Sequence, residues 1–307
     1  TVRMREYTPA MEGYAAFRGF KTRFRVVGKS QSRRALLCIH GGPGFGLDYL
    51  EPLDAMRTTG RQVVSYDQLG CGRSDHRAPD EGWSLDLFLE ELQAVRDAAG
   101  LARCHLLGHG WGGILALEYA LTRPGGVESL VLADTVASIP QWRQGLDRLA
   151  SSLPEEISIP LEHHRLSGSL AAPPCRCIVD AFLRRHFCRM NPWPECLERS
   201  VAEARRHPEA RLAMLGPSEL EPTGQLAGWD ITARLEEIDT PTLVVSGRYD
   251  LAPPEAAAAL YRGVASSEWV VFEHSAHVPH LEETQRYLEV LDGFLAKVEG
   301  RHRPASA

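Results

Sequence analysis

The sequence lacks the features that would place this protein in a membrane or on nucleic acid. No apolar run approaches the roughly 20 residues that a membrane-spanning helix needs. The net charge is −6, so there is no basic excess to attract nucleic acid or an anionic membrane. The first residues, Thr1 to Met4, include no apolar signal region. We therefore expect a cytoplasmic protein, a monomer or homodimer, that acts on a small molecule and has neither nucleic-acid nor membrane partners.

A disulfide framework and a cofactor motif are also missing. The seven cysteines are an odd number without a repeated spacing, which argues against a set of disulfides. Cys175, Cys177, Cys188 and Cys196 lie near one another in the sequence, but their spacing does not match a zinc pattern. The glycine-rich segments lack the spacing of a dinucleotide fingerprint or a phosphate-binding loop. We expect reduced thiols, no metal and no cofactor.

Segments typical of strands and helices alternate along most of the chain. Residues 1–30 predict two or three antiparallel strands. The later strands are predicted at Ala35–Ile39, Gln62–Asp67, Cys104–Leu107, Val127–Leu132, Pro241–Ser246 and Glu268–Phe272. Predicted helices separate these strands, including one that Ser84 caps. This alternation predicts an α/β fold with a mostly parallel sheet flanked by helices.

The pattern changes between residues 135 and 228. Prolines cluster there, and helix-like segments follow one another without buried strands between them. The chain of 307 residues is long enough for one large domain or for a core with a small lid. We therefore predict an α/β core formed by residues 1–134 and 229–307, with a helical cap formed by residues 135–228.

The segment Gly108-His109-Gly110-Trp111-Gly112 stands between a predicted strand and a predicted helix. This is the setting of the Gly-x-Ser-x-Gly nucleophile elbow, in which a sharp turn presents a serine above a parallel sheet. The serine position is occupied by Gly110, which has no side chain to acylate. Loss of a triad nucleophile lowers kcat on the order of 10⁶-fold. Conventional serine catalysis is therefore not expected of this sequence.

Other motifs accompany this elbow in a fixed order. They are His40-Gly41-Gly42-Pro43-Gly44, residues 66–74 (Tyr66-Asp67-Gln68-Leu69-Gly70-Cys71-Gly72-Arg73-Ser74), Trp229-Asp230-Ile231, Gly247-Arg248-Tyr249-Asp250, and His277 with residues 279–283. As a set they resemble the α/β-hydrolase fold and, within it, the proline iminopeptidase family. The resemblance spans nearly the whole chain, and its strength lies in the set of motifs taken together.

The resemblance implies roles for particular residues. Asp250 takes the place of the catalytic acid and His277 that of the base. The oxyanion donors are expected at the backbone N–H groups of Gly42 and Trp111, with Gly41 close by. Without the resemblance, Asp250 could be a turn residue before two prolines, and His277 one loop histidine among three. Their position and order favour catalysis.

The sequence departs from the family at a second position besides Gly110. Related aminopeptidases hold the substrate's amine with acidic residues, and one such residue is kept as Glu219. The other position is Arg248, whose cation would repel an ammonium group. We expect Gly41, Glu219, Arg248 and Trp193 to contact the substrate. Cys71 is a conceivable replacement nucleophile, but the family carries this loop as a structural turn.

Three interpretations follow from this combination. The first is an enzyme that uses the His277–Asp250 pair and the oxyanion hole for proton abstraction followed by addition, cyclisation, elimination or isomerisation. Carbon–carbon bond formation of the Michael type on a natural-product intermediate is one instance. The second is a proline iminopeptidase or amino-acid amidase in which an engineered change replaced the serine at position 110. The third is a ligand-binding protein without catalysis. We favour the first, because a protein that only binds has no need of an acid behind the histidine.

Overall fold

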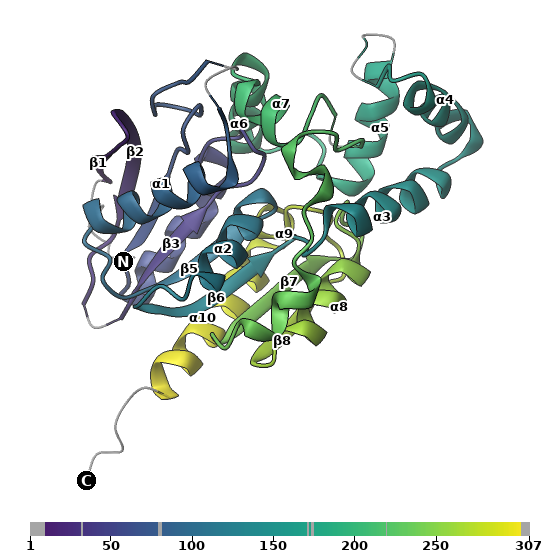
Figure 1. The fold of residues 1–307 in the computed structure, drawn as a ribbon. Helices are drawn as coiled ribbons and strands as arrows, with labels where there is room; N and C mark the ends of the chain where they lie inside the picture. The colour runs from purple at the N-terminus through teal and green to yellow at the C-terminus, as the bar shows by residue number, and fades with distance from the viewer. Residues whose placement is uncertain are drawn as a thin grey trace, which may run out of the picture.

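The computed structural model describes residues 10–31, 33–78, 82–170, 172, 175–218 and 220–301. These residues form one eight-stranded sheet with helices on both sides of it (Figure 1). The strands are β1 (Met11–Phe17), β2 (Phe20–Val27), β3 (Ala35–Ile39), β4 (Val63–Tyr66), β5 (Cys104–His109), β6 (Val127–Ala133), β7 (Thr242–Gly247) and β8 (Ser267–Phe272). The predicted strands are confirmed to within about two residues at each end, and the N-terminal region contributes two.

The sheet has the order β1-β2-β4-β3-β5-β6-β7-β8. β1 and β2 are antiparallel to each other, and β2 is antiparallel to β4, whereas the remaining neighbours are parallel. The predicted α/β fold with a mostly parallel sheet is therefore confirmed. His109 pairs with Ala133, and Ala133 pairs with Val245, so β5, β6 and β7 end at the same edge of the sheet. Functional residues that follow these strands are thereby brought together.

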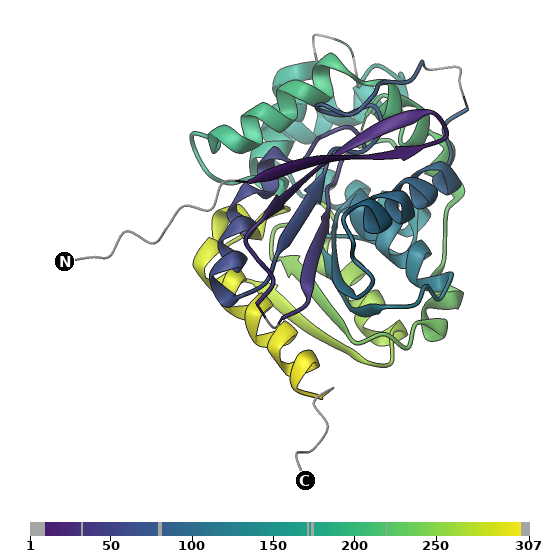
Figure 2. The same cartoon turned by 90° about the vertical axis from the view of Figure 1, so that its left-hand side faces the viewer.

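Helices cover both faces of the sheet, so its central strands are buried and apolar. Figure 2 shows α1 (Leu85–Ala98) on one side and η1 (Asp48–Thr59) with α10 (Thr284–Arg301) on the other. The backbone N–H of Leu87 donates to Ser84 Oγ at 3.2 Å, which confirms the predicted cap of α1. No helix in the described residues combines the length and hydrophobicity that crossing a bilayer requires. The other helices outside the segment between β6 and β7 are α2 (Trp111–Leu121), η4 (Thr232–Glu237), α8 (Pro254–Gly263) and α9 (Pro279–Glu282).

The chain between β6 and β7 is helical and lies over the carboxyl ends of the parallel strands (Figure 1). It contains α3 (Ile139–Ser151), α4 (Glu155–Leu166), α5 (Arg176–His186), α6 (Glu195–Arg206), α7 (Glu209–Met214) and η3 (Gln225–Gly228). Its two ends run side by side: the N–H of Ile139 donates to Trp229 O, and that of Ile231 donates to Ala137 O, each at 2.9 Å. The division into a core and a cap at residues 135–228 stays a prediction.

Candidate active site

The turn between β5 and α2 has the backbone shape expected of a nucleophile elbow. Gly110 has φ 53° and ψ −117°, a conformation that L-residues rarely adopt but that glycine adopts without strain. The strand and helix approach closely below it, since a Cβ atom on Gly108 would collide with the backbone carbonyl of Gly112. The turn is therefore built as in a serine hydrolase, but the residue at its apex presents only a backbone.

His277 and Asp250 form a buried pair opposite this turn. Asp250 follows β7 and is fully buried, and its Oδ1 lies 2.7 Å from His277 Nδ1. The same oxygen accepts the backbone N–H of Ala252 at 2.8 Å, which fixes the carboxylate. A carboxylate at this distance holds the proton of a neutral imidazole on Nδ1 and leaves Nε2 as the basic atom. In the part of the chain that the structure describes, His277 Nε2 has no hydrogen-bond partner.

The basic nitrogen of His277 faces the position where a nucleophile would stand. A Cβ atom built on Gly110 would lie 3.2 Å from His277 Nε2, and the next-nearest atom, Cε1 of the same ring, is 3.7 Å away. A serine hydroxyl carried by that Cβ would be within hydrogen-bonding reach of Nε2. The space that the missing hydroxymethyl group leaves is therefore directly in front of the base.

A second histidine, His109, forms a hydrogen bond with the backbone of His277. The Nε2 atom of His109 donates to His277 O at 2.7 Å, and its Nδ1 accepts from the Tyr49 hydroxyl at 2.8 Å. Burial lowers the pKa of His109 well below its usual value, so the ring is neutral, as this pair of bonds requires. The Tyr49 hydroxyl also accepts the N–H of Gly41 at 2.7 Å. The Gly41 N–H is therefore occupied and is not an oxyanion donor.

Two backbone N–H groups remain as candidate oxyanion donors. Trp111 is the first residue of α2, so its N–H has no acceptor within the helix. Gly42 belongs to the loop after β3, and both residues line the same cavity as His277. The indole of Trp111 is fixed by a bond from Nε1 to Gln68 Oε1 at 2.8 Å. The helix N-terminus and the fixed loop thus supply a region that favours negative charge.

Asp134, which follows β6, is a site residue that the sequence did not reveal. Burial, together with the nearby Asp250 carboxylate, raises the pKa of Asp134 well above its usual value. Its Oδ1 accepts the N–H of Gly247 at 3.1 Å. The Oδ2 atoms of Asp134 and Asp250 are buried, with no other partner among the described residues. Two buried carboxyl groups this close favour one proton between them over two negative charges, which agrees with the raised pKa of Asp134.

A cavity of about 370 Å³ lies between the sheet edge and the helices above it. Gly42, Gly110, Trp111, Asp134 and His277 form its floor. Its upper wall is mostly apolar but includes four charged side chains, which are those of Arg176, Asp180, Arg205 and Arg211. This volume suits a small organic molecule rather than a folded partner.

The residues predicted to contact the substrate differ in whether they line the cavity. Trp193 lines the cavity, as does Gly42, whereas Gly41 and Arg248 do not. The half-exposed guanidinium of Arg248 pairs with Glu273 at 2.7 Å, and a substrate contact at Arg248 stays a prediction. Glu219 lies outside the described residues. Cys71 is buried, and burial raises the pKa of its thiol well above the usual value, so the thiolate form of a nucleophile is disfavoured.

Comparison with known proteins agrees with this geometry. Residues 34–166 match the family described as the alpha/beta hydrolase fold. A proline iminopeptidase of Clostridioides difficile (strain 630) is 36% identical over 288 residues, which cover 92% of this chain and 97% of that protein. One from Lactobacillus delbrueckii subsp. lactis is 36% identical over 290 residues, covering 92% and 97%.

Solved structures show the same similarity in three dimensions. The proline iminopeptidase of Mycobacterium smegmatis superposes with a TM-score of 0.90 at 32% identity, covering 95% of this chain and all of that one. The structure of VinJ superposes with a TM-score of 0.91 at 34% identity, again covering 95% of this chain and 100% of the other.

Proposed function

The chain belongs to the proline iminopeptidase family of α/β-hydrolases, and from this premise we propose that it catalyses proton transfer on a small carbon acid without a covalent intermediate. His277 is the base, and Asp250 orients and stabilises it. The backbone N–H groups of Gly42 and Trp111 stabilise the negative charge that develops on a substrate oxygen. Gly110 supplies space in place of a nucleophile. Residues 135–228 act as the cap that closes the cavity.

The proposed reaction balances with the residues of the site alone. His277 Nε2 takes a proton from a carbon next to a carbonyl group. The electron pair of the broken C–H bond moves to the carbonyl oxygen, which becomes an enolate held by the Gly42 and Trp111 N–H groups. The enolate carbon then attacks an electrophilic carbon, or it expels a leaving group at the neighbouring position. The imidazolium of His277 returns the proton to the product or the leaving group.

The observation that carries the proposal is the free basic nitrogen of His277 in front of an empty nucleophile position. Nε2 points to the place where a Cβ atom on Gly110 would lie 3.2 Å away, and Asp250 holds the other ring nitrogen at 2.7 Å. A base with a buried carboxylate behind it and room for substrate in front is suited to proton abstraction. Hydrolysis through an acyl-enzyme is disfavoured, because Gly110 has no side chain that can be acylated.

The cavity wall indicates which small molecules fit. The charged side chains in this wall are three arginines, Arg176, Arg205 and Arg211, and one acidic residue, Asp180. Such a wall favours a substrate with an anionic or phenolic group on an otherwise apolar skeleton. It disfavours the free ammonium group of an aminopeptidase substrate. These three arginines take the role that the sequence assigned to Arg248.

A general carbon acid tests the proposal without knowledge of the natural substrate. A nitrobenzisoxazole loses its ring proton to a base while its N–O bond breaks, and it releases a coloured cyanophenolate. We expect the protein to accelerate this reaction, and His277→Ala to lower the rate by about 10²-fold or more. His274→Ala is the matched control, because His274 is an exposed histidine of the same loop. A rate that His277→Ala leaves unchanged would refute the proposal.

The interpretation as an altered serine hydrolase has one specific observation in its favour. The atoms around Gly110 are arranged so that a serine there would complete a Ser-His-Asp triad with His277 and Asp250. This interpretation predicts strong hydrolysis of prolyl or amino-acid amides once the serine is introduced. A protein that only binds ligands would show neither the proton-transfer activity nor this gain.

A further inference from the structure

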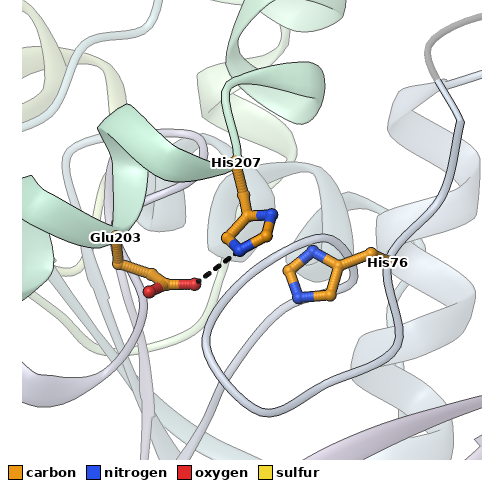
Figure 3. Close-up of side chains that lie close together, drawn as sticks. All are labelled: His76, Glu203 and His207. Atoms are coloured by element: carbon orange, nitrogen blue, oxygen red, sulfur yellow. Dashed lines mark ion pairs between the residues drawn. The ribbon is translucent and has the colours of Figure 1, made fainter.

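Three side chains with metal-binding atoms meet at a place outside the cavity. Figure 3 shows His76 from the loop after β4 together with Glu203 and His207 from the C-terminal end of α6. One ligand atom from each residue lies within 4.8 Å of the other two. His76 is exposed, whereas Glu203 and His207 are partly buried. In the described residues this is the one such group of histidine, cysteine and acidic side chains.

The spacing of the three groups is close to that of a zinc site. His207 Nε2 lies 3.7 Å from Glu203 Oε1, and the rings of His76 and His207 have centroids 4.0 Å apart. Ligand atoms about 2.1 Å from a tetrahedral zinc ion are about 3.4 Å from one another. The largest separation therefore has to close by little more than about 1 Å.

The elements that carry the three residues are fixed in place. The N–H of Asp75 donates to Lys21 O at 2.9 Å, and its Oδ2 accepts the Lys21 N–H at 2.8 Å, which ties the His76 loop to β2. Glu203 lies in the last turn of α6, and His207 is the residue directly after the helix, whose N–H donates to Glu203 O at 3.0 Å. Arg206 donates to Glu203 Oε2 at 2.9 Å, which leaves Oε1 directed toward His207. Such a partner orients a ligating carboxylate.

We propose that His76, Glu203 and His207 bind a divalent transition-metal ion of the zinc type. Two imidazole nitrogens and one carboxylate oxygen suit zinc, cobalt or nickel better than calcium or magnesium, which prefer oxygen ligands. Water occupies the fourth position, as is usual for a site with three protein ligands. This proposal revises the expectation from the sequence that the chain binds no metal.

The metal acts as a clamp on the cavity wall. Val201, Ala204 and Arg205 of α6 line the cavity. His76, in the loop after β4, lies next to Glu203 and His207 at the end of the same helix. None of the three ligands lines the cavity, so the ion stays apart from His277 and the reacting substrate. Arg199 already ties α6 to Asp48 and Glu51 of η1, and a bound ion adds a second tie, from the end of α6 to the His76 loop.

The test uses the full chain without an affinity tag and zinc chloride as the probe. Isothermal titration calorimetry is expected to show one site, and His76→Ala and Glu203→Gln are each expected to weaken zinc binding about tenfold or more. A variant with both His163 and His164 replaced by alanine is the matched control, because these neighbouring histidines lie on α4. Its affinity is expected to equal that of the unchanged chain. Circular dichroism confirms that the variants are folded.

Hydrogen exchange tests the clamp itself. Zinc is expected to slow exchange of the amides at residues 195–206 in the unchanged chain but not in His76→Ala. The absence of zinc binding, or equal affinity in His76→Ala, would overturn the metal site. Zinc binding that leaves the exchange of α6 unchanged would overturn the clamp. Neither readout depends on His277, so failure here is distinguishable from failure of the proposed catalytic function.

Discussion

Replacement of Gly110 by serine separates proton transfer from serine hydrolysis. The new Cβ would lie 3.2 Å from His277 Nε2, so the ring has to move by only a few tenths of an ångström, and the hydroxyl then donates to Nε2. That bond has to break before His277 takes a proton from a substrate. A net hydrogen-bond energy of about 0.5–1.5 kcal/mol corresponds to a two- to tenfold lower rate of nitrobenzisoxazole cleavage.

The same substitution also strains the turn. Position 110 has φ 53°, and an L-residue held in such a region costs about 1–3 kcal/mol of folding free energy. Chemical denaturation is expected to show a loss of this size. Gly110→Ala is the matched control, because it introduces the same strain and the same Cβ without a hydroxyl. Serine and alanine variants of equal stability but unequal rate would attribute the rate difference to the hydroxyl.

Two assays on the serine variant decide between the interpretations. A fluorophosphonate label reports an activated serine, and proline p-nitroanilide reports hydrolysis. We expect labelling of Gly110→Ser but only weak amide hydrolysis, because the arginine-rich wall opposes an ammonium group. Two results together would refute this reasoning: hydrolysis of proline p-nitroanilide by Gly110→Ser with a kcat of about 1 s⁻¹ or more, and no cleavage of the benzisoxazole by the unchanged chain. The protein would then be a serine hydrolase altered at one position.

Two further predictions concern buried carboxyl groups. Asp134→Asn should change the rate of benzisoxazole cleavage by less than about threefold and shift the midpoint of its pH profile by less than about half a pH unit, because a protonated acid and an amide are both neutral. A large shift of the midpoint would show that Asp134 is ionised. Burial raises the pKa of Glu91 to about 8, so the folded chain keeps a proton that the unfolded chain loses near pH 4.5, and stability falls as pH rises between these values. At most roughly 5 kcal/mol of the free energy of unfolding is lost over this pH range. Urea unfolding at several pH values should show a much smaller fall in that free energy for Glu91→Gln, and parallel plots of stability against pH for the two proteins would contradict this.

The framework of the site was predictable because it depends on local pattern. Continuous apolar runs such as Ala35–Ile39 predict strands covered on both faces, and the glycines around His109 predict a sharp turn after a strand. The order of the motifs then places Asp250 and His277 at the same sheet edge. The strands and the turn need only the period of the backbone, whereas the choice of Asp250 and His277 also depends on the resemblance to the proline iminopeptidase family.

The rest of the site depends on contacts between distant segments, which a single sequence does not report. Asp134 follows β6 like any turn residue, and only the structure shows that it is buried beside Asp250, which raises its pKa. Tyr49 meets His109 across 60 positions of the chain. Arg248 stands two residues before Asp250, yet its side chain turns outward to Glu273, since the backbone direction of a loop is not set by spacing. The arginines of the cavity wall come from helices whose packing no motif marks.

The side-by-side ends of the segment between β6 and β7 also bear on how this protein can diversify. Residues 137–139 and 229–231 form a narrow neck, held by two backbone hydrogen bonds, through which the helices join the sheet. Insertions, deletions or exchange of the helices alter what lies beyond the neck and leave the strand pairing below it intact. The exchange is constrained at the site itself, because the N–H of His277 donates to Phe187 O at 3.0 Å and that of Leu251 donates to His186 O at 2.9 Å. A segment grafted from a relative therefore has to keep these two carbonyl groups in place.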